Sequence, residues 1–572
     1  MSGPEGPVRS DQIFFFIKHR DTERTEVSVS LCFNFLSSDY LLIMANQLPY
    51  YEWVPSWLRD VGVIALLILQ SFVFGLSTDM LPELTGELGT LAENVKFIIQ
   101  ANAIGFLCTL PLYYRFRSFF KKKDLLLGAL LLQLFLARAA GQMAFVPGLC
   151  LLNFCIGITK CMVTLDMIGL LMARFNPTNN RAFFYGLYYT IAKPVALLAD
   201  LSLAWLIHQY NWHYAVWLSV PAILASIGIT ALLFHGERLL PKVPLSEVDW
   251  MGAVLLTLTC VLFTFIADFG KYYDWFSSAI IDWSVVFFLL VATLFVLWEL
   301  RQERPYWNLR IFGQYKQIRL GVLLMLVLCL FIYSSSLARQ FALGLVKGDS
   351  WFLGRLTVST LLAYLISFPL CSWLLARQVS YRLLLLTGFG CYMLSYGYIV
   401  LTISPGIDPA NLYLFYFLQG IAYGLILTTL STFASTDIMV ADNPHRAFAS
   451  VAARSVIGLV TVGSVWDNAL FQRSAINRNN LISRLTDEND SFQQEVQLLI
   501  RRFTQAGFDP QHARAAADQL MYQKVDAQAM LLADKDLFAS LLLLTVAIVL
   551  CIPFMRSLEM HNVRPTNQYP LV

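Results

Sequence analysis

The amino-acid sequence predicts an all-α polytopic membrane protein with about fourteen transmembrane helices. Of its 572 residues, 57% are hydrophobic and only 14% are charged, whereas a typical soluble domain is about 25% charged. The mean hydropathy is +0.59, and apolar runs long enough to cross a bilayer, which takes about 20 residues, recur along most of the chain. These values exclude a soluble enzyme and a disordered scaffold. The net charge of +3 is too small to indicate a nucleic-acid partner.

The expected spans must be α-helices because each backbone amide left unpaired in lipid costs several kcal/mol. The sequence lacks the alternating segments of about ten residues that mark a transmembrane barrel. The expected spans are residues 60–82, 95–114, 124–142, 146–173, 183–206, 213–235, 250–268, 280–300, 319–345, 351–376, 382–403, 410–434, 447–470 and 536–556.

The basic residues of the short loops predict the orientation of the chain, since positively charged loops tend to stay in the cytoplasm. Arg115, Arg117 and Lys121–Lys123 lie between the second and third spans, and the later even-numbered loops are also basic. The odd-numbered loops carry mainly acids or few charges, with Glu83 and Glu87 in the first of them. We therefore expect both termini in the cytoplasm, which requires an even number of spans.

The spans are expected to form two six-helix bundles with two extra helices between them. The expected parts are a cytoplasmic tail at 1–59, the first bundle at 60–235, the extra helices with their cytoplasmic loops at 236–318, the second bundle at 319–556 and a cytoplasmic tail at 557–572. Residues 1–43 lack the cleavage pattern of a signal peptide. We expect either that Met44 is the true start or that residues 1–43 are a disordered tail.

A long polar insert, residues 471–534, separates the last two spans and falls on the outer side of the membrane. We expect it to be helical. Asp509 followed by Pro510 predicts a helix start, with a capping carboxylate and a proline at the first helical position. Two interpretations stay open for the insert: a solvated cap on the last two spans, or a docking surface for a partner in the cell envelope.

Short motifs in the loops resemble those of one transporter family. The most specific motif is Phe269–Ser278, between the two extra helices. The others are Leu81–Gly89, Ser246–Gly252, Trp298–Leu300 and Trp307–Phe312. Together with the outline of spans, they resemble the fourteen-span drug:proton antiporter family (EmrB/QacA type) of the major facilitator superfamily, over residues 60–556.

The signature motifs of that family are degenerate in this chain. The fifth-span signature GxxxGPxxGG keeps only its proline, Pro194. Its four glycine positions hold Tyr189, Lys193, Leu197 and Leu198. The acid that the family usually carries in the first span is replaced by Val73. The outline of the family is therefore retained, while its antiport signatures are not.

Ionisable side chains inside the spans are the candidate functional residues, because a charge at mid-membrane costs about 2.5–3.5 kcal/mol on insertion scales. Asp79 lies near the outer end of the first span, Lys160 and Asp166 lie on the fourth, and Lys193 and Asp200 lie on the fifth. Seven residues turn a helix by about 700°, so Lys193 and Asp200 share a face, about 10 Å apart. We expect each to meet its partner on another helix.

The second bundle holds fewer charges in mid-span. Arg454 lies about two turns into the thirteenth span, where a role in a cavity or an interface is expected. Arg339 lies near an outer end, where snorkelling of the side chain explains it. Gln419 is a polar candidate beside Gly420 and Gly424, a Gly-x-x-x-Gly pair that indicates either close helix packing or a site.

The resemblance implies a proton-coupled efflux transporter for amphipathic small molecules or drugs in a bacterial inner membrane. It also implies that spans one and four line a central cavity and that span five flanks it. Asp79, Asp166 and Asp200 would titrate protons, with Lys160 and Lys193 as their counter-charges. A periplasmic adaptor and an outer-membrane channel are the implied partners.

Three other interpretations of these residues stay open. The charges could form buried ion pairs that fix helix packing, or Lys160 could hold the substrate of an organic-anion permease. A degenerate member could also act as a membrane sensor or assembly partner without transport. The sequence has no GxxxxGK[ST] motif for ATP and no metal-spaced histidines or cysteines. We therefore expect no enzyme activity, cofactor or metal.

Overall fold

The computed structural model describes residues 50–73, 81–175, 180–210, 212–236, 245, 248–345, 350–404, 406–436, 438–439, 442–485, 490–555 and 558. All of them belong to one compact unit, Pro49–Val572. The expectations for residues 1–43 and for Asp79 therefore lie outside the described residues.

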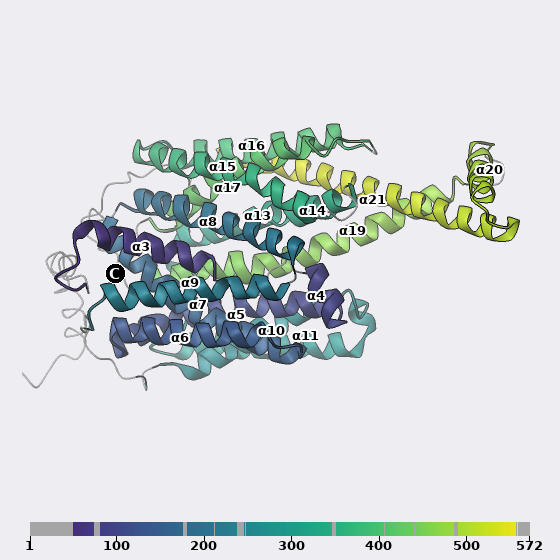
Figure 1. The fold of residues 1–572 in the computed structure, drawn as a ribbon. Helices are drawn as coiled ribbons and strands as arrows, with labels where there is room; N and C mark the ends of the chain where they lie inside the picture. The colour runs from purple at the N-terminus through teal and green to yellow at the C-terminus, as the bar shows by residue number, and fades with distance from the viewer. Residues whose placement is uncertain are drawn as a thin grey trace, which may run out of the picture. The chain divides into compact units, whose positions relative to one another are not determined.

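A first helical group comprises the helices before residue 236 (Figure 1). Its members are α3 (Ser56–Ser71), α4 (Leu81–Leu88), α5 (Ala92–Phe119), α6 (Lys122–Ala140), α7 (Val146–Phe175), α8 (Arg181–Gln209) and α9 (Trp212–Leu233). Within it, α5 packs along α7, α6 lies between α7 and α9, and α3 contacts α7, α8 and α9.

A second helical group follows the paired helices α10 (Trp250–Phe269) and α11 (Ala279–Arg301) and the short helix α12 (Ile311–Gln314). In this group α17 packs against α15 and α16, and α21 packs against α16 and α19. Its members are α13 (Lys316–Ile332), α14 (Ser334–Leu345), α15 (Ser350–Ala376), α16 (Tyr381–Thr402), α17 (Asn411–Ala434), α18 (Asn443–Val451), α19 (Gly458–Ile482), α20 (Asp490–Gln505) and α21 (Pro510–Cys551).

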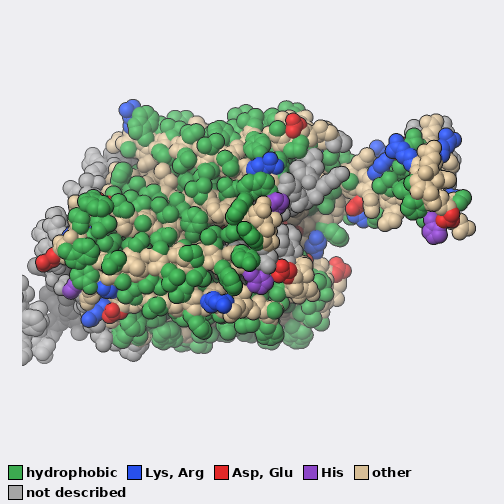
Figure 2. All heavy atoms as spheres, viewed as in Figure 1, with side chains coloured by type: hydrophobic (Ala, Val, Ile, Leu, Met, Phe, Trp, Pro, Cys, Tyr) green, Lys and Arg blue, Asp and Glu red, His purple; other side chains and the backbone are tan. Residues whose placement is uncertain are grey.

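The all-α fold class is confirmed. In the described part of the chain, 12 helices are long and apolar enough to cross a membrane. Helices α3 and α6 are not among them, although both pack inside the first helical group. Hydrophobic side chains cover most of the visible face of the bundle in Figure 2, and most of the charged side chains there lie toward its ends and on the insert. The number fourteen stays a prediction.

Two of the expected spans are interrupted. The span expected at 319–345 is divided between α13 and α14 at Tyr333. There the Ser334 hydroxyl donates to the Phe331 carbonyl at 2.6 Å, a local bond that competes with the helical ladder. The span expected at 447–470 contains a π-helical segment, Ala452–Ile457, between α18 and α19. Such segments are rare in helices and often lie at functional sites.

The insert is formed by the end of α19 and the start of α21, with α20 between them (Figure 1). The sequence placed the helix start correctly at Pro510, but the expected cap is wrong, because the Asp509 carboxylate contacts the His512 ring instead of a backbone amide. Small side chains of α21 are fully buried where it packs on α19 and α20: Ala513, Ala517 and Ala529.

Ion pairs fasten the helices of the insert to one another. Arg478 of α19 lies 2.6 Å from the Asp526 carboxylate of α21. Lys524 of α21 lies 2.7 Å from Glu495 of α20, and this ammonium holds the pKa of Glu495 below its usual range. The Glu495 carboxylate is therefore ionised at neutral pH.

Two glycines allow α5 and α7 to cross in backbone contact. A Cβ atom on Gly157 would lie 2.1 Å from the Asn102 carbonyl oxygen, and one on Gly105 would lie 2.1 Å from the Phe154 carbonyl oxygen. Because both obstacles are backbone atoms, rotation of a side chain cannot relieve the clash. The crossing therefore requires glycine at both positions.

Gly157→Val is expected to destabilise the protein by about 3 kcal/mol or more, at the upper end of the cost of overpacking a core. Gly169→Val is the matched control, because Gly169 lies on the same helix with no atom within 4 Å of its added Cβ. Thermal unfolding of the two purified variants measures the difference. Equal unfolding temperatures would contradict the assigned backbone contact.

Candidate functional site

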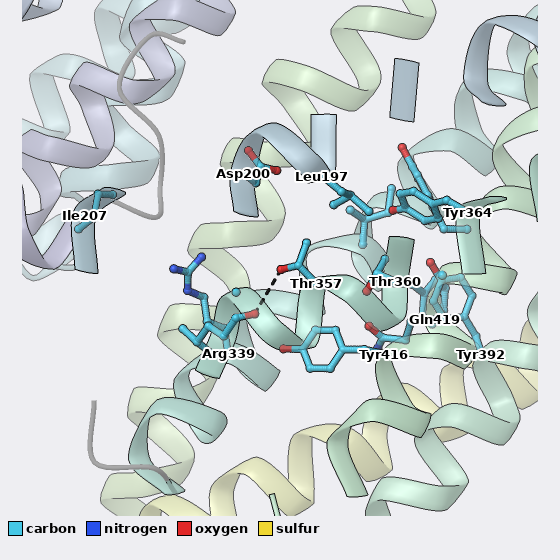
Figure 3. Close-up of a pocket in the computed structure, with 16 residues that line it drawn as sticks. Leu197, Asp200, Ile207, Arg339, Thr357, Thr360, Tyr364, Tyr392, Tyr416 and Gln419 are labelled. Atoms are coloured by element: carbon cyan, nitrogen blue, oxygen red, sulfur yellow. Dashed lines mark hydrogen bonds between the residues drawn. The ribbon is translucent and has the colours of Figure 1, made fainter. Parts of the chain in front are cut away.

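A cavity of about 270 Å³ lies between α8 of the first helical group and several helices of the second (Figure 3). The wall contains one carboxylate, one guanidinium and four tyrosines. Its lining residues are Leu197, Asp200, Ile207, Phe331, Ile332, Arg339, Leu353, Gly354, Thr357, Thr360, Tyr364, Tyr392, Tyr416, Gln419, Gly420 and Tyr423. Asp200 and Gln419, which the sequence singled out as site candidates, both line the cavity.

The two charged residues of the cavity face it from different helical groups. Asp200 projects from α8, and Arg339 projects from α14 (Figure 3). The Asp200 carboxylate also lies within electrostatic reach of Lys160 on α7 and of the Tyr364 hydroxyl on α15. The sequence assigned Arg339 to snorkelling at an outer end, because position along a helix does not reveal which way a side chain points.

Aromatic rings and amide groups form the opposite wall of the cavity. The Tyr364 and Tyr423 rings lie 5.4 Å apart between centroids, and the Phe331 ring stacks on Tyr392 at 5.2 Å. The Gln419 amide donates to the Tyr396 hydroxyl at 3.5 Å. Such a wall offers flat apolar surface with a few hydrogen-bonding groups, as small-molecule sites usually do.

Two of the predicted cations lie behind the tyrosine wall. The Lys193 ammonium is 5.6 Å from the centroid of the Tyr423 ring, within the range of a cation–π interaction. Arg454, in the π-helical segment, lies beside Tyr188, Tyr189 and Tyr423. Tyr423 therefore connects both cations to the cavity, and the run of tyrosines in α8 is a feature that sequence reasoning missed.

The remaining two predicted site residues lie at different places. The Lys160 ammonium donates to the Val73 carbonyl at 3.1 Å. Asp166, only 1% exposed, accepts a hydrogen bond from the Tyr113 hydroxyl at 2.7 Å and lies 3.9 Å from the Lys122 ammonium. The ion-pair partner of Asp166 is thus Lys122, not Lys160 or Lys193, and Asp166 does not line the cavity.

The two helical groups meet closely along the first half of α8. The Ser372 hydroxyl of α15 donates to the Ala182 carbonyl at 3.2 Å, and a Cβ on Gly186 would lie 2.1 Å from Ser372. The Tyr189 and Ser431 hydroxyls are 2.8 Å apart. The cavity lies along the second half of α8, so it is adjacent to this contact between the groups.

A second contact between the groups runs along α5 and α19. The Lys96 ammonium of α5 lies 2.5 Å from the Asp467 carboxylate of α19, and Gln100 donates to Asp268 of α10 at 3.1 Å. The loop after α11 reaches the other end, where the Tyr306 hydroxyl donates to the Cys108 carbonyl. The extra helices therefore bridge this contact, which the sequence did not predict.

Solved transporter structures share this fold. A mutant of the peptide transporter POT in complex with alafosfalin superposes with a TM-score of 0.54 at 13% identity, covering 91% of this chain and 99% of the other. A POT family transporter in complex with 5-aminolevulinic acid also gives 0.54, at 12% identity, covering 87% of this chain and 97% of the other. The chain therefore has the fold of these transporters, and it is a polytopic membrane protein.

Sequence relatives are export and resistance proteins. The multidrug export protein EmrB of Escherichia coli K12 is 21% identical over 332 residues, 58% of this chain and 62% of the relative. The probable multidrug resistance protein EmrY of the same strain is 21% identical over 337 residues, 58% and 64% of the two chains. The chain thus spans about six tenths of the length of these curated relatives. No family model matches the chain.

Proposed function

We propose that this protein is a secondary active transporter that exports amphipathic small molecules in exchange for protons, across a bacterial inner membrane with both termini in the cytoplasm. One observation carries the proposal: an acid-bearing, aromatic cavity lies between the two helical groups, which are in direct contact next to it. Alternating access requires such a site, because the groups rock against each other around it. The similarity to export proteins supports the direction of transport.

Asp200 is the proposed proton carrier of the cycle. Its carboxylate lies near the Lys160 ammonium, and an opposite charge favours the ionised form. When a rearrangement within the first helical group moves Lys160 away, the carboxylate binds a proton more readily. Return of Lys160 releases that proton. If the two conformations open to opposite sides, each cycle moves a proton inward as a substrate moves outward.

Asp200→Asn is expected to reduce efflux of an amphipathic dye to background in everted membrane vesicles, since the amide cannot carry the proton. A protonophore should give the same loss in the wild-type protein. Asp274→Asn is the matched control, because Asp274 is an exposed acid in the loop between α10 and α11 and its variant should export normally. Efflux that withstands both Asp200→Asn and the protonophore would overturn proton coupling.

An organic-anion facilitator is the second candidate. Three cations lie at or near the cavity, Arg339 in its wall and Lys160 and Lys193 close to it, and they outnumber the single acid. In this case an organic anion should cross the vesicle membrane at the same rate with and without the protonophore. Lys160→Ala should abolish binding of the anion.

The insert is proposed to dock a periplasmic adaptor that leads to an outer-membrane channel. Large apolar side chains are exposed on it or beside it: Ile482, Leu498, Phe508, Tyr522 and Met530. Exposed apolar groups of this kind indicate an interaction site. Cross-linking in the host membrane followed by purification tests the proposal, and recovery of the transporter with no adaptor attached would count against it.

A further inference from the structure

The charges in the cavity wall point to the chemistry of the ligand. Asp200 and Arg339 have opposite signs and belong to different helical groups. Figure 3 shows both side chains on the same side of the cavity, with Tyr364, Tyr392 and Gln419 on the other. A ligand in the cavity therefore meets a negative and a positive group at one end and aromatic surface at the other.

A ligand with a single charge fits this arrangement poorly. A cation would be attracted by Asp200 and repelled by Arg339. An anion would be attracted by Arg339 and repelled by Asp200. In a site of low dielectric constant, such repulsion costs far more than it does in water. A molecule that carries both an ammonium and a carboxylate can satisfy both groups at once.

The remaining wall limits the body of the ligand. Tyr364, Tyr416 and Tyr423 offer ring faces or edges, against which an aromatic or apolar body packs well. The Thr357 hydroxyl, which donates to the Leu353 carbonyl at 3.2 Å, and the Thr360 hydroxyl can accept hydrogen bonds from the ligand. The volume of about 270 Å³ lies just below the roughly 300–1,000 Å³ of sites for drug-sized ligands, so the ligand is small.

We propose that the cavity binds a small zwitterion with an aromatic or apolar body. Its ammonium pairs with the Asp200 carboxylate, and its carboxylate accepts paired hydrogen bonds from the Arg339 guanidinium, whose planar fork suits that group. The inference rests on the proposed function in taking this cavity as the transport site. It goes further in naming the charge type of the substrate.

Three probes with the same aromatic body and different charge test the proposal on the purified full-length protein. They are phenylalanine (zwitterion), phenylalanine methyl ester (cation) and N-acetylphenylalanine (anion), with binding measured by titration calorimetry. The zwitterion should bind about tenfold or more tightly than either analogue, because each analogue loses one charge-assisted contact. Similar affinities for the three probes, or no binding of the zwitterion, would overturn the proposal.

Variants at position 339 test whether Arg339 causes the preference for the zwitterion. Arg339→Gln should weaken zwitterion binding about tenfold or more and leave binding of the methyl ester unchanged or tighter. Arg339→Lys, which keeps the charge, should keep the zwitterion as the preferred probe. Arg355→Gln is the control, because Arg355 is exposed with its guanidinium 5.5 Å from the centroid of the Phe352 ring. An unchanged preference in Arg339→Gln would contradict the assignment.

Flux measurements separate this inference from the proposed function. Proton-dependent dye efflux by a protein that binds no zwitterion would leave the transporter function standing and remove the inference. Zwitterion binding that depends on Arg339, in a protein that moves no substrate, would support the inference and remove the function.

Discussion

Cross-linking position 96 of α5 to position 467 of α19 is expected to abolish transport. These positions carry the Lys96–Asp467 ion pair, which joins the two helical groups at 2.5 Å. A covalent link there holds the groups together, so they cannot rock apart around the cavity. The measurement is dye efflux from vesicles bearing Lys96→Cys and Asp467→Cys, treated with a bifunctional thiol reagent that is cleaved by dithiothreitol.

Single variants provide the control for the cross-link. Both side chains are partly exposed, 34% for Lys96 and 24% for Asp467, so the reagent can reach them. Lys96→Cys or Asp467→Cys alone should keep its efflux after treatment, and dithiothreitol should restore efflux in the linked protein. Normal efflux in a fully cross-linked sample would show that this contact does not open during transport.

Asp166→Leu is expected to destabilise the protein by about 3–5 kcal/mol, the usual cost of removing one partner from a buried ion pair. It leaves the Lys122 ammonium, 8% exposed, without the carboxylate 3.9 Å away. The double variant Asp166→Leu/Lys122→Met should recover most of this loss, because apolar replacement of a whole buried pair is often neutral. Thermal unfolding in nanodiscs measures both variants.

The same pair of variants decides between two roles for Asp166. Lys121→Met is the stability control, since Lys121 is the exposed neighbour of Lys122. If the folded double variant exports normally, Asp166 serves packing alone. If it folds and exports nothing, the Asp166–Lys122 pair takes part in transport, which agrees with the role proposed for Asp166 from the sequence. Equal unfolding temperatures for the single and double variants would contradict the ion pair itself.

Much of the fold could be predicted from the sequence, because hydropathy reports directly on what the bilayer requires. The expected spans 95–114 and 410–434 correspond closely to α5 (Ala92–Phe119) and α17 (Asn411–Ala434). Interruptions of a helix, such as the π-helical segment around Arg454, do not change the hydropathy of the span. No pattern in the sequence therefore predicts them. The proposed division into domains remains a prediction.

The site was harder to predict because hydropathy gives the depth of a residue and not its direction or its neighbours. Asp200 and Gln419 were chosen for polarity at depth, and both line the cavity. Arg339 lies at similar depth to residues that snorkel, so only the packing of α14 reveals that it faces the cavity. Lys122 was counted as a loop charge, although it is buried beside Asp166.

The length of helix α21 has a mechanical consequence. It runs for 42 residues without interruption, roughly 63 Å at 1.5 Å per residue, about twice the ~30 Å thickness of the hydrocarbon core. One end is seated against α16 and the other against α20. A partner protein bound at the α20 end of α21 is therefore connected by a rigid helix to the second helical group. Movement of one end of this helix can shift the other end without any change in the lipid.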